Sequence, residues 1–379
     1  DVAFQTWVMQ RALPGHEIMP FLMLTDKNKK STVDGLNQLF RIERDEHDRI
    51  EVIPAVEITA ENMGEPILAQ INVSELVSRI MRGEDFPEPK KTVESRKGFE
   101  ARIREYGEVY SRDDKYPVSI GLKCKSCEYK NTKQPDLKSG FNECWKGQVG
   151  EEYNPDAPHI FDLWNFRKSD ELISKNIISF TDIYDLPNPE MYLNERQMLQ
   201  FLKTHTNDFT ESINPELRNE MNSWTFPMHF IDFETSMVAL PFTNGRKPYE
   251  QTAFQFSAHT MHRDGRMEHY EWIDAYRGVF PNYEFVRQLK AVLDKDEGTI
   301  FRYAAHENTV LRQIQTQMME DDEQKYGDLI EWIDTITEYK IGKSKVAGPR
   351  NMVDMLQLVR EYYYHPDMKG SNSIKAVLP

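Results

Sequence analysis

The amino-acid sequence predicts an α/β protein: a mixed β-sheet with flanking helices in its C-terminal part, preceded by a smaller α/β region. Two observations indicate this class. Between residues 226 and 364, segments with strand-like alternation and segments with apolar residues at helical spacing follow one another in the order β-β-β-α-β-α. Residues 1–83 also mix helical and extended patterns, on a smaller scale.

The N-terminal region has short elements. At 379 residues the chain is long enough for two or three domains. We expect an α/β region over 1–154, a small helical linker module over 155–225 and the sheet domain over 226–379. The elements expected in the first region are helices over 1–13, 73–83 and 94–112, strands over 21–26 and 50–58, and a Pro-rich, charged connector over 84–91.

The C-terminal region begins with three strands in meander order. A helix over 281–298 follows, with Phe285, Val286 and Leu289 among the apolar residues on one face. The other elements expected are strands over 228–235, 251–261, 267–276 and 299–305, a second helix over 306–319, and a short strand entering a helix over 351–364.

Composition and charge narrow the range of functions. The chain has 47 Lys and Arg against 62 Asp and Glu, a net charge of −15 at pH 7. Bulk attraction to nucleic acid is therefore not supported, although a local basic groove would suffice. No apolar run is long enough to cross a bilayer. The chain opens on Asp1 without a signal-peptide pattern, so we expect its natural start to lie upstream.

All three cysteines fall within one short stretch. Cys124, Cys127 and Cys144 form the pattern C-x2-C-x16-C. So few cysteines favour a reducing, cytoplasmic compartment, and the closely spaced pair can offer two thiolates to one metal or cluster. We expect the three to converge on an iron–sulfur cluster, of the 4Fe-4S type, or on Zn²⁺; three buried, unrelated cysteines are the alternative. The fourth ligand is open, either a Cys upstream or a His such as His159.

Two carboxylates interrupt the apolar run His-Phe-Ile-Asp-Phe-Glu-Thr. Asp232 and Glu234 are two residues apart, so they point to the same face of the predicted strand. We expect this strand to be central and buried, where a charge is costly unless paired or metal-bound. Mg²⁺ or Mn²⁺ takes oxygen ligands and would remove the repulsion between the pair. The same spacing at Asp321 and Glu323 lies in a polar run, where solvation explains it.

The chain order resembles that of the ribonuclease H-like fold, whose first strand lies centrally. "FIDFET" resembles the first motif of the DEDD exonucleases, and "FRYAAHENTVL" resembles the second, with Glu307 where an Asp is usual. The resemblance implies that Asp232, Glu234 and Glu307 are catalytic, metal-binding residues. Asp354, in "DMLQLVR", belongs to the same metal site, nearby but outside the direct ligands. The third motif would lie beyond the last residue.

A wider resemblance covers nearly the whole chain. "KCKSCEYK", "SGFNECW", "FIDFET", "PYEQTAFQFSAH" and "YYYHPDMKGSNSIKAVLP" resemble the bacterial "domain of unknown function 2779" proteins. That family implies an incomplete RecB-type nuclease region with a cluster-binding Cys segment, joined to a DEDD exonuclease-like domain. The RecB-type acids would precede Asp1.

Two functions follow from these resemblances. The first is a divalent-metal-dependent, exonuclease-like hydrolase that cleaves nucleic-acid phosphodiesters by a two-metal mechanism, with DNA favoured over RNA and no membrane partner. The alternative is a catalytically decayed nuclease fold that binds nucleic acid or protein. Glu307 in place of Asp and the acidic net charge favour the alternative, whereas the intact Asp232 and Glu234 pair favours the enzyme.

Overall fold

A computed structural model describes residues 1–84, 98–116, 118–131, 133–134, 136–150, 153–154 and 156–378. The chain divides into two compact units: residues 1–117, 234–254 and 273–283 form the first, and residues 118–233, 255–272 and 284–379 form the second. These units cut across the three predicted segments, because spatial contacts and not chain order define them. The segment boundaries stay a prediction, and all but the first residue of the predicted connector lies outside the described residues.

The first unit contains short helices and two-stranded sheets. Its elements are α1 (Val2–Ala12), β1 (Phe21–Thr25), β2 (Phe40–Arg44), β3 (Ile50–Pro54), α2 (Ala60–Met63), β4 (Leu68–Asn72), α3 (Ser74–Arg82) and α4 (Phe99–Ser111). β1 pairs with β4 and β2 pairs with β3, both antiparallel. Ala3 and Val77 join α1 to α3 in a small core. The expected helix end at Gly83 is confirmed, and its φ of 71° suits a residue without a Cβ.

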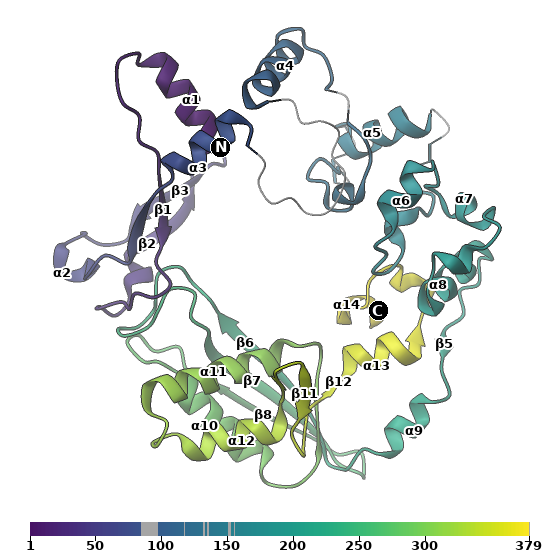
Figure 1. Cartoon of the computed structure of the whole chain (residues 1–379). Coiled ribbons are helices and arrows are strands. Elements are labelled where there is room, and N and C mark those ends of the chain that lie inside the picture. Colours follow the sequence, from purple (N-terminus) through teal and green to yellow (C-terminus); the bar gives the residue numbers. More distant parts are fainter. Residues whose placement is uncertain are drawn as a thin grey trace. The chain divides into compact units, whose positions relative to one another are not determined.

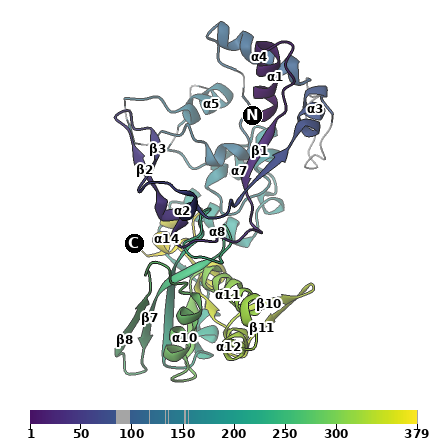
Figure 2. The same cartoon turned by 90° about the vertical axis from the view of Figure 1, so that its left-hand side faces the viewer.

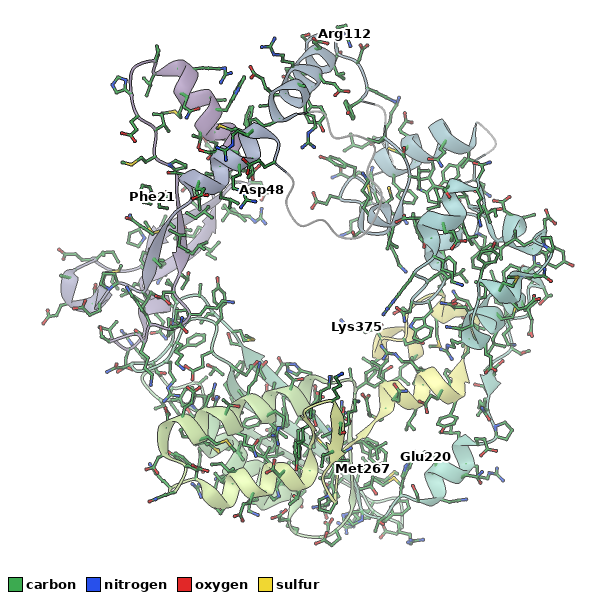
Figure 3. All side chains as sticks on the ribbon, in the orientation of Figure 1. Phe21, Asp48, Arg112, Glu220, Met267 and Lys375 are labelled. Atoms are coloured by element: carbon green, nitrogen blue, oxygen red, sulfur yellow. The ribbon has the colours of Figure 1, made fainter. Side chains whose placement is uncertain are left out.

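The second unit opens with a helical part. Its elements are α5 (Gly140–Val149), α6 (Ser169–Ser174), α7 (Phe180–Tyr184), α8 (Glu195–His205), β5 (Ser212–Ile213) and α9 (Leu217–Asn222). Trp145, Ile160, Leu172 and Ile183 are fully buried and belong to one core. The short helices predicted over 155–225 are therefore present, and they pack together with α5. The last helix of this part along the chain is α9, on which Glu220 is labelled in Figure 3.

A five-stranded mixed sheet follows. It contains β6 (Met228–Ser236), β7 (Thr252–Met261), β8 (Met267–Ile273), β9 (Thr299–Arg302) and β12 (Val353–Asp354). The strand order is β12-β9-β6-β7-β8. β6 is parallel to β9, with Met228 opposite Thr299, and β9 is parallel to β12. The predicted mixed sheet is confirmed, with its first strand in the centre as expected.

Three helices cover one face of this sheet. They are α10 (Asn282–Leu293), α11 (His306–Asp322) and α12 (Gly327–Ile336), and both views show them on the same side of the strands (Figures 1 and 2). The ring of Phe285 on α10 meets Phe233 and Phe256 edge-on, with centroids 4.9 and 5.5 Å apart. Phe285, Val286 and Leu289 are fully buried, as their helical spacing predicted.

The chain ends in short elements: β10 (Glu338–Ile341), β11 (Ser344–Ala347), α13 (Met355–Tyr362), β13 (Tyr363–Tyr364) and α14 (Ile374–Val377). β10 and β11 form a hairpin, and β13 pairs with β5. The predicted strand entering a helix over 351–364 is confirmed as β12 and α13. Among the helices that the structure describes, none combines the length and apolar character that a membrane span requires.

Candidate functional site

The central strand β6 carries the first pair of predicted site residues. Its burial alternates: Ile231 and Phe233 are 5% and 4% exposed, whereas Asp232 and Glu234 are exposed to solvent. The expectation of a buried strand is therefore wrong for the face that carries these carboxylates. The physical reason is that α10 packs on the Phe233 face, so solvent reaches the opposite one. Their predicted placement on one face of the central strand is confirmed.

Glu307 lies in the first turn of α11 and is only 3% exposed. Its Oε2 is buried and has no hydrogen-bond partner among the described residues. The pKa of Glu307 is raised to about 7: burial is the largest cause and the negative charges of Asp232 and Asp354 add to it, against the opposing effects of its own backbone N–H and the Arg302 guanidinium. The structure thus brings Glu307 into the electrostatic field of Asp232 and Asp354.

Asp354 holds the turn that begins α11. Its Oδ1 accepts hydrogen bonds from the backbone N–H groups of Ala304 and Leu356, both at 3.0 Å, and its Oδ2 accepts one from Arg302 Nη1 at 3.1 Å. Ala304 has a φ of 73°, a left-handed conformation that costs energy for a residue with a Cβ. Asp354 therefore caps α13 and fixes a strained turn three residues before Glu307.

The partners of Asp354 also define its role. Hydrogen bonds from Arg302 and from three backbone N–H groups already engage its carboxylate oxygens. These hydrogen bonds make Asp354 a positioning residue, and its place outside the direct ligands of an ion stays a prediction.

Arg302 is a site residue that sequence reasoning missed. It is 3% exposed, donates to the carbonyl oxygen of Ala304, and its Nη2 lies 3.9 Å from Glu338. Its Nε is buried without a partner in the described part of the chain. The signal was present: Arg302 is a cation in the apolar strand Thr-Ile-Phe-Arg, and a buried cation requires anionic neighbours.

The acidic residues offer oxygen donors of the kind that divalent ions prefer. No three His, Cys, Asp or Glu side chains of the described residues gather closely enough to hold a metal ion. In donor type and charge, however, the residues fit. Glu307 has an unpartnered carboxyl oxygen beside the charge of Asp232, and oxygen donors are those that Mg²⁺ and Mn²⁺ prefer. Shared coordination by Asp232, Glu234 and Glu307 stays a prediction.

The three cysteines lie in the helical part of the second unit. Cys124 is in the 3-10 helix η2 (Leu122–Ser126), Cys127 follows it and Cys144 is in α5. All three are half-buried free thiols, and Cys124 and Cys127 pack against the core around Trp145. The described residues do not gather them into a metal-binding group. Their convergence on a cluster or Zn²⁺ stays a prediction.

His159, the predicted alternative fourth ligand, is 7% exposed. Its Nδ1 accepts a hydrogen bond from the backbone N–H of Phe161 at 3.3 Å, and its ring lies 4.9 Å from that of Trp145. One ring nitrogen is therefore already used by the backbone.

The fold and these carboxylates define a class: a mixed α/β domain with acidic residues on its central strand and at the start of the helix after β9. Residues 229–373 match the family model described as "Domain of unknown function (DUF2779)". The predicted family is thereby confirmed. Neither the curated proteins nor the solved structures contain a match to the chain. The RecB-type region and the Cys segment precede the matched residues, so that composition stays a prediction.

Proposed function

We propose that this protein is a divalent-metal-dependent nuclease that hydrolyses nucleic-acid phosphodiester bonds, with Asp232, Glu234 and Glu307 as its catalytic, metal-binding residues. One observation carries the proposal: the buried Glu307 carboxyl lies in the field of Asp232, and its Oε2 has no hydrogen-bond partner among the described residues. A buried carboxyl oxygen without a hydrogen-bond partner is unfavourable for folding. Such groups concentrate at functional sites, where a ligand compensates them.

The chemistry follows from the donors. Mg²⁺ or Mn²⁺ bound there would supply an activated water and charge stabilisation at the leaving oxygen. The chain's part is to hold the acids: Asp232 and Glu234 share one face of β6, and the turn fixed by Asp354 and Arg302 sets the position of Glu307. An exonuclease-like action on DNA, and a cytoplasmic location, belong to the same proposal.

A second candidate function is a nuclease fold without catalysis that binds nucleic acid or a protein. The observation that favours it is the solvent exposure of Asp232 and Glu234, since solvated carboxylates need no ion to be stable. The two candidates differ in their response to Mn²⁺. Only the enzyme requires the Asp232 carboxylate to bind the ion.

The test combines metal binding and cleavage. Mn²⁺ binding to the wild type, to Asp232→Asn and to Glu307→Gln is measured by calorimetry, and cleavage of end-labelled DNA and RNA oligonucleotides is followed with the same proteins. We expect both variants to lose Mn²⁺ binding and Mn²⁺-dependent cleavage while their circular dichroism is unchanged. Asp321→Asn, in the second D-x-E, is the matched control and should behave as the wild type.

Two results would count against the proposal. Absence of Mn²⁺ binding by the wild type would favour the non-catalytic fold. Undiminished cleavage by Asp232→Asn would place the active site elsewhere in the protein.

A further inference from the structure

The Cys segment has a charge opposite to that of the whole chain. The net charge of the protein is −15, yet residues 122–149 contain six lysines against three acids, Glu128, Asp136 and Glu143. All six lysines are exposed. We call them the lysine surface; they are Lys123, Lys125, Lys130, Lys133, Lys138 and Lys146.

Local structure holds much of this surface in place. Lys123 and Lys125 lie on η2. Asn131 is held against residues further along the chain, because its Nδ2 donates to the carbonyl oxygens of Gln134 and Leu137 at 2.6 and 2.9 Å. Two of the lysines thus lie on a short helix, and Lys146 lies on α5.

Contacts with α5 bring parts of the surface together. The ammonium group of Lys130 lies 4.7 Å from the ring centroid of Phe141, on the first turn of α5. Lys125 and Lys130 both lie close enough to the His159 imidazole to affect its pKa. Burial lowers that pKa, and the positive charges of Lys130 and Lys125 lower it further, against the opposing charge of Asp162. Lys125 and Lys130 therefore act on one buried group from the same neighbourhood.

The described residues do not neutralise the lysine charges. Within the described residues, no ion pair involves any of the six lysines. Elsewhere, by contrast, Lys203, Lys290 and Lys345 lie 2.5–3.3 Å from carboxylates. Exposed lysines without ion pairs on an acidic protein favour binding of an external polyanion.

An aromatic side chain stands among these cations. Tyr129 is 77% exposed, and its backbone oxygen accepts a hydrogen bond from Gly140 N–H at 2.9 Å. Its position at the start of α5 is therefore fixed while its ring faces solvent. Lysines interleaved with an exposed aromatic ring are typical of surfaces that bind single strands, where ammonium groups contact phosphates and a base stacks on the ring.

We propose that the lysine surface binds single-stranded nucleic acid, with the ammonium groups on the phosphates and Tyr129 stacked on a base. The choice of nucleic acid among polyanions rests on the proposed nuclease function. The charge and the exposure of the lysines are observed independently of that function. The surface would hold the substrate at residues separate in sequence from the acidic site.

The test measures binding without catalysis. A fluorescent single strand of about 20 nucleotides is titrated with the full chain in EDTA, and binding is read by anisotropy. The test variant is Lys123→Glu, Lys125→Glu and Lys138→Glu together, with Lys130 kept because it packs on Phe141. The matched control is Lys340→Glu, Lys343→Glu and Lys345→Glu, which changes charge equally on the β10–β11 hairpin.

We expect the test variant to bind at least about tenfold more weakly near 0.1 M salt, with a salt dependence smaller by about two units in log–log slope, because three phosphate contacts are lost. The control should bind as the wild type does. Tyr129→Ala should weaken single-strand binding about tenfold but leave duplex binding unchanged, and Tyr129→Phe should restore it.

Equal weakening by the control would show a bulk charge effect and overturn the proposal, as would undiminished binding by the test variant. Competition by a polyglutamate peptide as strong as by the single strand would show an acidic protein partner instead. The two proposals fail separately: Asp232→Asn should keep EDTA binding even if it abolishes cleavage, and a protein without any cleavage still tests the lysine surface.

Discussion

Glu307→Gln tests the central electrostatic feature of the candidate site. The substitution keeps the shape of the side chain and removes its ionisation. In the wild type the pKa of Glu307 is raised from 4.5 to about 7, first by burial. Between these two values the folded chain binds more protons than the unfolded chain. The free energy of unfolding therefore falls as the pH rises from about 4.5 to about 7.

The size of the effect follows from the shift in pKa. At about 1.4 kcal/mol per pH unit, the wild type loses about 3 kcal/mol across this window, and Glu307→Gln does not. The variant should therefore gain about 3 kcal/mol relative to the wild type between pH 4.5 and pH 8. Urea unfolding in EDTA, followed by tryptophan fluorescence across this range, measures the difference. Glu323→Gln, an exposed acid, is the control.

Parallel pH profiles of the wild type and Glu307→Gln would refute the reasoning, because they would show that Glu307 ionises as readily when folded as when unfolded. Mn²⁺ adds a second readout. It should stabilise the wild type more at pH 8 than at pH 5.5, since the ion displaces the proton that Glu307 holds at the lower pH, and it should not stabilise the variant.

Three further changes test the surrounding structure. Asp354→Asn should destabilise the protein by about 2–3 kcal/mol and weaken Mn²⁺ binding, because the buried Arg302 loses its anionic partner; unchanged urea midpoints would contradict this. Gly298→Ala should prevent stable folding, since its Cβ would lie 1.9 Å from the backbone oxygen of Pro227. Gly147→Ala, in open space on α5, should instead stabilise the protein by roughly 0.5–1 kcal/mol. Thermal unfolding of the two variants measures both effects. Replacing the C-x2-C cysteines by Ser should abolish bound iron or zinc in anaerobically purified protein, and metal analysis that finds equal content in the variant would exclude the predicted site.

Several features could be read from the sequence because they depend on neighbours along the chain. The two-residue period of a strand is enough to place Asp232 and Glu234 on one face. The helical spacing of Phe285, Val286 and Leu289 is enough to identify the buried side of α10. Gly83 marks the end of α3, since a helix often ends at a residue with positive φ.

Tertiary structure decided which of the acids are buried and which are exposed to solvent. The apolar run around Asp232 predicted a buried strand, yet α10 packs on the opposite face and leaves this carboxylate in solvent. Glu307 lies in a more polar run, yet it is the one buried acid among the residues that the structure describes. Arg302 and Asp354, 52 residues apart, meet because β9 and β12 are parallel neighbours. Burial and ion pairing depend on which surfaces pack together, and a linear pattern contains no record of that packing.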